Sequence, residues 1–263
     1  MLKIRLIPVM LLREGILVKS YQFNRFLPVG NPLNAIRFFN QWDVDEILFL
    51  DITPNKPKKL GRVDDNYQRF ATLADYTQYI AKHCFVPLTV GGGVKTIEDM
   101  RVLFNAGADK VVINTLVHRQ PEILQQAAAS FGRQALVVSI DVKKKRWGKY
   151  EVVTGYGKEA TGKDPVAWAK TVEGLGAGEI FLTSMDRDGT QEGYDLKLLR
   201  QVAEAVGIPV IASGGVGKWQ DLVDGVKQGK ASAVAAANIF HFSEMSTVYA
   251  KKYMQQKGLD VRI

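Results

Sequence analysis

The feature that most constrains the fold is a regular alternation of short apolar segments with longer amphipathic ones along the 263-residue chain. The apolar segments are rich in Val, Ile, Leu and Phe, which is typical of strands buried on both sides of a parallel sheet. Eight such strands alternate with eight helical segments, and no linker separates them. This pattern predicts an α/β fold, a (β/α)8 TIM barrel with a two-fold half-barrel repeat, formed by residues 1–263 as one domain.

The segments themselves are assigned from apolar runs, capping residues and turn residues. Strands are expected at residues 6–12 (resumed at 15–19), 47–52, 87–90, 110–114, 136–142, 179–184, 208–212 and 231–236. Helices are expected at about residues 32–41, 67–83, after the cap at Thr96, 120–131, 164–175, 195–206, 218–227 and 243–257. Residues 20–32 and 54–62 are expected as loops, and residues 143–158 as a hairpin insertion that turns at Trp147-Gly148.

Acidic residues end two of the predicted strands. The strand that contains Phe181 stops at the run Asp186-Arg-Asp188-Gly189, and the strand before it ends at Asp141. In a parallel barrel the carboxyl ends of the strands form the face where chemistry occurs. Asp141 and Asp188 are therefore predicted to be catalytic.

The chain also repeats itself once, at about half its length. Phe49–Ile52 matches Phe181–Ser184, Val90–Gly93 matches Ser213–Val216, and Met10-Leu11 matches Ile140-Asp141. Glycine loops offer backbone N–H groups to anions, so a repeated loop predicts two phosphate sites on opposite sides of the barrel mouth. The residues expected to bind a phosphorylated substrate there are Gly92, Gly93, Asn114, Thr115, Thr183, Gly189, Ser213, Gly214, Gly215, Ala237 and Asn238.

Charge and residue counts exclude several classes of protein. The net charge of +8 permits a nucleic-acid-binding module, but the basic residues are scattered and no nucleic-acid motif is present. The single cysteine excludes an intramolecular disulfide and a thiolate metal cluster, and the three histidines lack metal-ligand spacing, so no metal or cofactor is expected. No apolar run approaches the length of a membrane span, and the N-terminus lacks a signal-peptide layout, so a cytoplasmic location is expected.

Several motifs together resemble the cyclase subunit of imidazole glycerol phosphate synthase, over nearly the full chain. They are Val90–Gly93, Gly107–Thr115, Gly176–Thr190, Gly193–Asp195 and Ile211–Gly215. The resemblance implies a heterodimer with a glutaminase docked on the N-terminal face of the barrel. It also implies that ammonia passes through the barrel and reacts with a bisphosphorylated ribulosyl-formimino aminoimidazole carboxamide ribotide. The products in that family are imidazole glycerol phosphate and an aminoimidazole carboxamide ribotide.

The resemblance carries over unevenly to individual residues. Lys19 matches the family's substrate-phosphate lysine, and Asp141 matches one of its two catalytic aspartates. The other catalytic aspartate falls on Leu11, and the internal repeat independently aligns Leu11 with Asp141. A reaction that uses one carboxylate to give a proton and another to take it has lost one of the two, because leucine cannot titrate.

A ring of alternating charges that gates ammonia in the family matches Arg5, Glu46, Lys110 and Glu179. Each of these residues lies at the start of a predicted strand, so all four side chains would meet at one end of the barrel. Ordinary surface charge at strand entries is the alternative for any one of them. If the gate is kept, Arg5 and Lys110 should each lie between Glu46 and Glu179.

Two functional hypotheses remain. The first is a lyase, the cyclase subunit of a glutamine-dependent synthase in histidine biosynthesis; Lys19, Asp141 and the two phosphate sites favour it. The second is a divergent paralogue that supplies ammonia for amination or amidination in the biosynthesis of surface-polysaccharide sugars, including those of lipopolysaccharide. It would work with a glutaminase and a third, amidotransferring protein. Leu11, with the charged ring retained, favours the second hypothesis.

Overall fold

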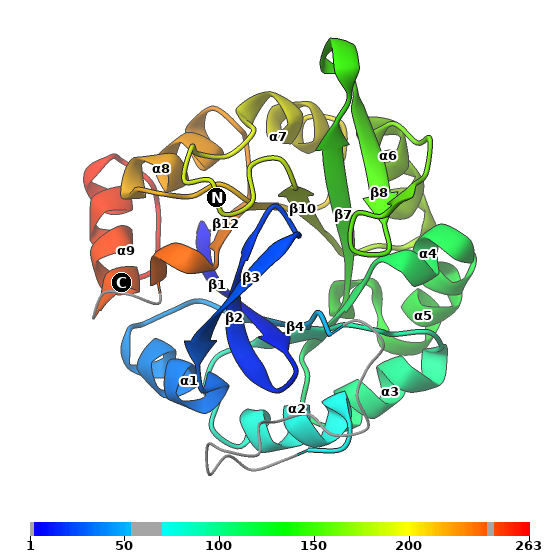
Figure 1. Cartoon of the computed structure of the whole chain (residues 1–263), viewed down its shortest axis with the longest axis horizontal. Coiled ribbons are helices and arrows are strands. Elements are labelled where there is room, and N and C mark those ends of the chain that lie inside the picture. The colour runs from blue at the N-terminus through cyan, green and yellow to red at the C-terminus, as the bar shows by residue number, and fades with distance from the viewer. Residues whose placement is uncertain (1–2, 54–69, 241–244) are drawn as a thin grey trace.

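The computed structural model describes residues 3–53, 70–240 and 245–263, and it contains a closed barrel of parallel strands (Figure 1). The last barrel strand pairs with the first, since Leu6 lies opposite Val234, and this contact closes the barrel. The TIM barrel predicted from the sequence is therefore confirmed. Its eight strands are β1 (Arg5–Arg13), β4 (Ile47–Asp51), β5 (Leu88–Gly91), β6 (Lys110–Ile113), β7 (Leu136–Lys144), β10 (Glu179–Ser184), β11 (Val210–Ser213) and β12 (Ala233–Ala236).

Helices surround the barrel on its outside (Figure 1). They are α1 (Pro32–Gln41), α2 (Leu73–Ala81), α3 (Ile97–Asn105), α4 (Thr115–Arg119), α5 (Ile123–Phe131), α6 (Pro165–Leu175), α7 (Leu196–Ala203), α8 (Trp219–Lys227) and α9 (Ser246–Gln256), with 3-10 helices at Arg133–Ala135, Arg146–Gly148 and Asn238–Phe240. Thr96 caps α3 and forms a capping box with Asp99, as the sequence predicts. No helix in these described ranges has the length and hydropathy needed to cross a membrane.

Two hydrophobic clusters follow from the alternation of side chains along the strands. In β1, Leu6 and Met10 belong to the large cluster between the strands and the helices. Ile7 and Val9 belong to a smaller cluster that fills the inside of the barrel. Leu11 packs against this inner cluster from the carboxyl end of the strand. Residues two apart along a barrel strand thus point into the same interior, where any site must be built.

The prediction of a loop at residues 20–32 is wrong. β2 (Ile16–Tyr21) pairs antiparallel with β1, and β3 (Arg25–Gly30) pairs with β2. The side chains of β3 are mostly exposed or half-buried, and Pro28 interrupts its pattern. Such an edge strand is held by its backbone hydrogen bonds rather than by burial, so it lacks the apolar signal of a core strand.

The helix predicted at residues 120–131 is also divided. α4 ends before Pro121, because the residue that precedes a proline is disfavoured in helical geometry, and Gln120 is non-helical. α5 then starts at Ile123.

The predicted loop at residues 54–62 and the first residues of the helix predicted at 67–83 lie outside the described part of the chain. Within the described part, α2 starts at Leu73, directly after Thr72, which forms a capping box with Asp75.

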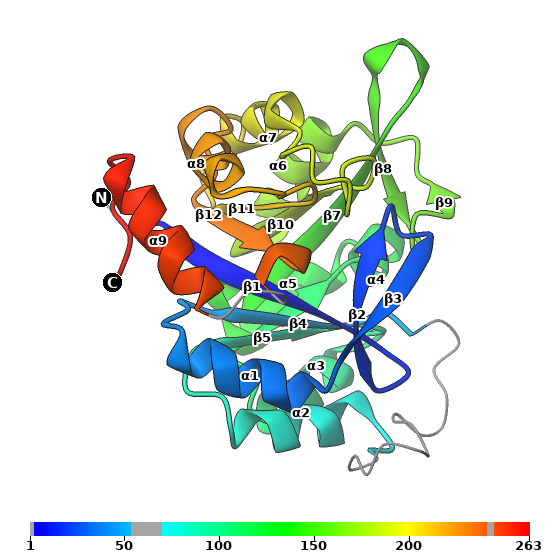
Figure 2. The ribbon, with the colours of Figure 1, turned by 60° about the vertical axis from the view of Figure 1, so that its left-hand side comes forward.

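The predicted hairpin insertion is present. β7 continues beyond the barrel and pairs antiparallel with β8 (Tyr150–Thr154), which pairs with β9 (Glu159–Ala160). The turn between β7 and β8 contains Trp147 and Gly148, as predicted. In both ribbon views this hairpin projects away from the body of the barrel (Figure 2).

Candidate functional site

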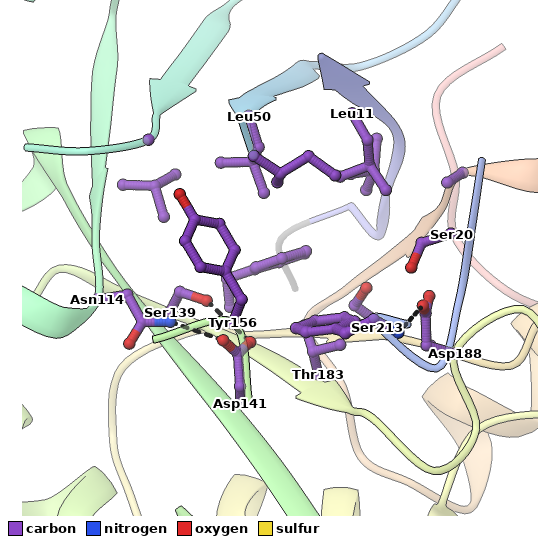
Figure 3. Close-up of a pocket in the computed structure, with 18 of the residues that line it drawn as sticks. Leu11, Ser20, Leu50, Asn114, Ser139, Asp141, Tyr156, Thr183, Asp188 and Ser213 are labelled. Carbon is purple, nitrogen blue, oxygen red and sulfur yellow. Dashed lines mark hydrogen bonds between the residues drawn. The ribbon is translucent and has the colours of Figure 1, made fainter. Parts of the chain in front are cut away.

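A cavity of about 240 Å³ opens at the carboxyl ends of the barrel strands. Strand ends and the loops that follow them supply its walls, and Figure 3 shows how the polar side chains converge from below while two leucines lie above. The cavity brings together Leu11 and nearly every residue predicted to bind substrate or to act in catalysis: Gly92, Gly93, Asn114, Thr115, Asp141, Thr183, Asp188, Gly189, Ser213, Gly214, Gly215, Ala237 and Asn238.

Lys19 is the exception. It lies within β2, opposite Leu27 of β3, and it is not among the residues that line the cavity. Its neighbour Ser20 does line the cavity, since successive side chains of a strand point to opposite sides. Because of this alternation, the side chain of Ser20, which was not predicted to be a site residue, points into the cavity, whereas that of Lys19 does not line it.

Asp141 is the central titratable group of the cavity. Its carboxylate is buried and accepts hydrogen bonds from Asn114 Nδ2 at 2.7 Å and from Ser139 Oγ at 3.4 Å. Burial raises the pKa of Asp141 to about 6; the two hydrogen bonds oppose this shift, and the negative charge of Asp188 adds to it. A carboxyl group with such a pKa exchanges a proton readily near neutral pH, as a general acid or base must.

Asp188 follows β10 and joins two loops over the cavity. Its backbone carbonyl accepts from Gln22 N at 2.9 Å, and its carboxylate accepts from Phe23 N at 3.4 Å. Burial raises the pKa of Asp188, while the nearby Ser20 side chain and the backbone N–H groups of Phe23 and Gln22 oppose the rise. The β2–β3 turn is thereby fixed to the loop that carries this second carboxyl group.

The cavity has an apolar wall and a polar wall. Leu11 of β1 lies opposite Leu50 of β4, whereas Asp141 of β7 lies opposite Thr183 of β10. No Lys, Arg or His is among the described residues that line the cavity; its charged side chains are all carboxylates, those of Asp51, Asp141 and Asp188. Among the described lining residues, the groups that could hold an anion are therefore backbone N–H groups and neutral side chains.

The two glycine loops, which contain Gly92 and Gly214, leave no space for a side chain at these two positions. An added Cβ on Gly92 would lie 2.2 Å from the carbonyl oxygen of Asp51, and one on Gly214 would lie 2.6 Å from that of Ser184. Both glycines also have positive φ angles, +119° and +91°. Each loop therefore packs its backbone directly against the neighbouring strand, and only glycine fits at these two cavity-lining positions.

The strand register corrects the internal repeat by one residue. Because Leu11 pairs with Leu50 and Asp141 with Thr183, the equivalent of Leu50 is Thr183, and Phe49 does not match Phe181. Leu50 pairs with Gly91 and Thr183 with Ser213, so Gly91, rather than Val90, corresponds to Ser213. The repeat predicted from the sequence aligned the two identical phenylalanines, Phe49 and Phe181. For the glycine runs, the sequence allowed two alignments that differ by one residue, and the structure supports the other one.

Some polar groups in the cavity have no partner within the described chain. The hydroxyl of Thr183 and the side-chain carbonyl of Asn238 are buried there without a hydrogen bond to described residues. Tyr156, from the turn between β8 and β9, extends its ring over the cavity, and its hydroxyl donates to the carbonyl oxygen of Thr53 at 3.3 Å (Figure 3). Neither Tyr156 nor Ser139 was predicted to lie in the site; of the two, only Ser139 could have been found from the sequence, since it lies two residues before Asp141 on the same strand.

At the opposite end of the barrel, Arg5, Glu46, Lys110 and Glu179 form a closed ring of ion pairs. Arg5 contacts Glu46 at 2.6 Å and Glu179 at 2.9 Å, and Lys110 contacts Glu46 at 2.9 Å and Glu179 at 2.8 Å. Each cation lies between the two carboxylates, which is the arrangement expected from the sequence. Burial by itself lowers the pKa of Arg5, but attraction to Glu179 and then to Glu46 outweighs it, so that the pKa is raised.

The ring and the cavity are aligned through the barrel. Arg5, Ile7, Val9 and Leu11 follow one another at steps of two along β1, and Glu179, Phe181 and Thr183 do the same along β10. The ring residues do not line the cavity, whereas Val9, Phe181 and the residues beyond them do. One layer of the inner apolar cluster, which includes Ile7, therefore separates the charged ring from the cavity floor.

A comparison with known protein families agrees with this architecture. The family model described as Histidine biosynthesis protein matches residues 5–246, which is nearly the whole chain. The match begins at the first residue of the charged ring and includes every barrel strand. The chain belongs to the histidine biosynthesis protein family.

Proposed function

We propose that this member of the histidine biosynthesis protein family receives ammonia from a glutaminase at its N-terminal face and presents it to a phosphorylated substrate in the cavity. We further propose that it is a divergent paralogue of the cyclase subunit, in which Leu11 has replaced a catalytic aspartate. The observation that carries the proposal is the combination of a complete charged ring with a leucine at the cavity position equivalent to Asp141.

The ring supports ammonia transfer because it is expensive to maintain for stability alone. Glu46 is only 2% exposed, and ionic groups taken out of water are often replaced by apolar side chains without loss of stability. Here both cations contact both carboxylates, and Glu46 also accepts from Thr89 Oγ1 at 2.5 Å. In an ammonia channel, such a closed ring of charges would block water and cations while no ammonia is being delivered. A barrel without a channel would need no such ring.

The layer above the ring favours a small neutral molecule. Its apolar side chains include Ala233 and Ala235, which leave more room than the larger residues beside them. Ammonia is uncharged and small, whereas the ammonium ion would lose its hydration on entering this layer. The proposed route therefore starts at the ring, crosses the alanine side of the interior and ends below Asp141.

The cavity supports a substrate that is anionic and that reacts by proton transfer. Two glycine loops offer backbone N–H groups, and Thr183 and Asn238 offer unpaired polar atoms. Asp141 has the pKa of a usable acid or base, but Leu11 provides no second group at the equivalent position. Removal of one positioned acid or base typically lowers a rate by about 10² to 10⁴. We therefore expect ammonia delivery to a third, amidotransferring protein in surface-polysaccharide biosynthesis rather than full cyclase turnover.

One observation favours the alternative, a histidine-pathway cyclase that makes imidazole glycerol phosphate. Asp188 is a second carboxyl group in the same cavity, it also has a raised pKa, and its charge acts on Asp141. Asp188 would then have taken over the role lost at Leu11. A turnover assay with the family's bisphosphorylated substrate and ammonium salt separates the two proposals. A rate at least about 10²-fold below that of an aspartate-containing cyclase supports the paralogue, and an ordinary rate supports the cyclase.

A further inference from the structure

The tip of the β7–β8 hairpin has no role in the cavity or in the charged ring. Residues 143–149 are all exposed, and five of these seven are Lys or Arg. Trp147, at the turn, is 97% exposed, which is the highest value among the exposed large hydrophobic residues. The hairpin projects beyond the barrel in both ribbon views, so that the tip is accessible from several sides (Figures 1 and 2).

The turn holds the tryptophan outward by its backbone geometry. Trp147 and Gly148 have φ angles of +65° and +73°, and Lys145 N donates to the carbonyl oxygen of Lys149 at 2.7 Å across the turn. Lys145 also forms an ion pair with Glu151 at 2.6 Å, which fixes one strand to the other. A large indole kept in water gains contact area when a partner covers it, and tryptophan and arginine are the residues that most often dominate binding energy at protein interfaces.

The base of the hairpin is tied to the loop that carries Asp188. Lys144 N donates to Asp186 Oδ2 at 2.6 Å, and the Tyr150 hydroxyl lies 2.9 Å from both carboxylate oxygens of Asp195. These two aspartates bracket Asp188 within one loop. A partner on the hairpin tip would therefore sit on the mouth side of the barrel, mechanically linked to a cavity residue.

The distribution of charge indicates what kind of partner fits. Lys143, Lys144, Arg146 and Lys149 form no ion pair with any other described residue, so the tip attracts negative charge. Below the tip, however, the half-buried carboxylates of Asp186 and Asp195 lie at the hairpin base, and neither forms an ion pair with a described residue, whereas the carboxylate of Glu151 is buried and paired with Lys145. A nucleic acid or an anionic membrane that extended past the tip would meet these acids, and a second copy of a chain with net charge +8 would be repelled.

We propose that the hairpin tip is a docking element for an acidic patch on another protein, which binds beside the mouth of the barrel and takes up the nitrogen-containing product. This proposal rests on the proposed function, which supplies the reason for a partner at the mouth. A protein surface matches the hairpin because it can set acidic residues against the tip and basic residues against the base. The partner binds opposite the glutaminase, so both are accommodated on one barrel.

Fluorine NMR of the full chain labelled with 5-fluorotryptophan tests the docking without any turnover. The chain has four tryptophans, and the Trp147→Phe variant assigns the resonance of Trp147. A short oligoglutamate peptide is titrated at low salt, in parallel with a short DNA duplex and with phosphatidylserine-containing vesicles. We expect the peptide to shift the Trp147 resonance saturably and more tightly than the other two probes. Because ammonia plays no part in this assay, failure of the ammonia route leaves its result unchanged.

Charge reversal provides the matched control. The double variant Lys144→Glu/Arg146→Glu should weaken peptide binding by about 10-fold or more. The double variant Lys197→Glu/Lys252→Glu makes the same change in net charge at exposed helix positions, and it should weaken binding less than about 2-fold. No shift at Trp147, an equal loss in both variants, or tighter binding of DNA or vesicles than of the peptide would each overturn the proposal.

Discussion

Leu11 and Asp141 occupy equivalent positions in the two halves of the barrel. Leu11 lies beside Leu50 across β1 and β4 in the same way that Asp141 lies beside Thr183 across β7 and β10, and the two pairs form opposite sides of one cavity (Figure 3). The backbone is therefore repeated while the chemistry is not. Of these two equivalent positions only that of Asp141 carries an acid or base, and this difference determines what the pair can be expected to do.

The first prediction restores the missing carboxylate. Leu11→Asp should raise ammonium-dependent turnover of the family substrate by at least about 10-fold, because it supplies a titratable group at the position that mirrors Asp141. Leu50→Asp is the matched control: it introduces the same group at the neighbouring cavity position, and it should leave turnover unchanged. Equal activation by both variants would mean that the position of Leu11 has no special role.

The second prediction concerns pH. The pKa of Asp141 is about 6 in the folded protein and 3.8 in its ordinary state, so between these values the folded state binds more protons than the unfolded state. The free energy of unfolding must then fall as the pH rises through this interval, by about 3 kcal/mol from this group. Asp141→Asn removes the titration, so the variant should gain stability relative to wild type by that order of magnitude between about pH 4 and pH 7. Urea unfolding at several pH values measures it, and a pH-independent difference would contradict it.

The third prediction breaks the charged ring. Lys110→Met leaves Glu46 and Glu179 with Arg5 as their only ring partner, and loss of one member of a buried ion pair costs about 3 kcal/mol. The added change Glu46→Gln should recover part of this loss, since it removes the buried charge left behind. Lys170→Met, at an exposed position of α6, should change the free energy of unfolding little.

The same ring variant tests ammonia transfer. With a glutaminase bound, Lys110→Met should lower the product formed per glutamine hydrolysed, while the reaction driven by ammonium salt is less affected. This pattern follows if the ring opens and closes the route, because added ammonium reaches the cavity from its mouth. Full coupling in the Lys110→Met variant would argue against an ammonia route through the ring.

The fourth prediction concerns phosphate. Gly92→Ala and Gly214→Ala each force a methyl group against a backbone carbonyl and should weaken phosphate binding at their own loop by about 10-fold or more. Gly162→Ala controls for backbone strain, because Gly162 has a φ of +72° and no heavy atom within 4 Å of an added Cβ. Calorimetric titration with inorganic phosphate measures the loss. Unchanged affinity in both loop variants would show that the anion binds elsewhere.

The barrel could be predicted from the sequence because its strands are buried on both sides and its helices have clear caps. The ring could be predicted because the resemblance to the cyclase family implies it, and the positions of Arg5, Lys110 and Glu179 at the first residues of strands agree with that implication. β3 could not be, because its exposed side chains resemble those of a loop. The contribution of Tyr156 was also hidden, since it depends on how the β8–β9 turn folds back over the mouth to reach Thr53, a contact between segments far apart in the chain.

The unequal walls of the cavity also have a consequence for the direction of binding. Two glycine loops of similar backbone would accept a ligand with a phosphate at each end equally well either way round, and half of the encounters would be unproductive. Leu11 and Asp141 remove that equivalence, because one wall favours the apolar part of such a ligand and the other favours its hydrogen-bonding part. If both loops bind phosphate, the two differences between the walls, Leu11 against Asp141 and Leu50 against Thr183, would determine which end of such a ligand lies nearest to Asp141.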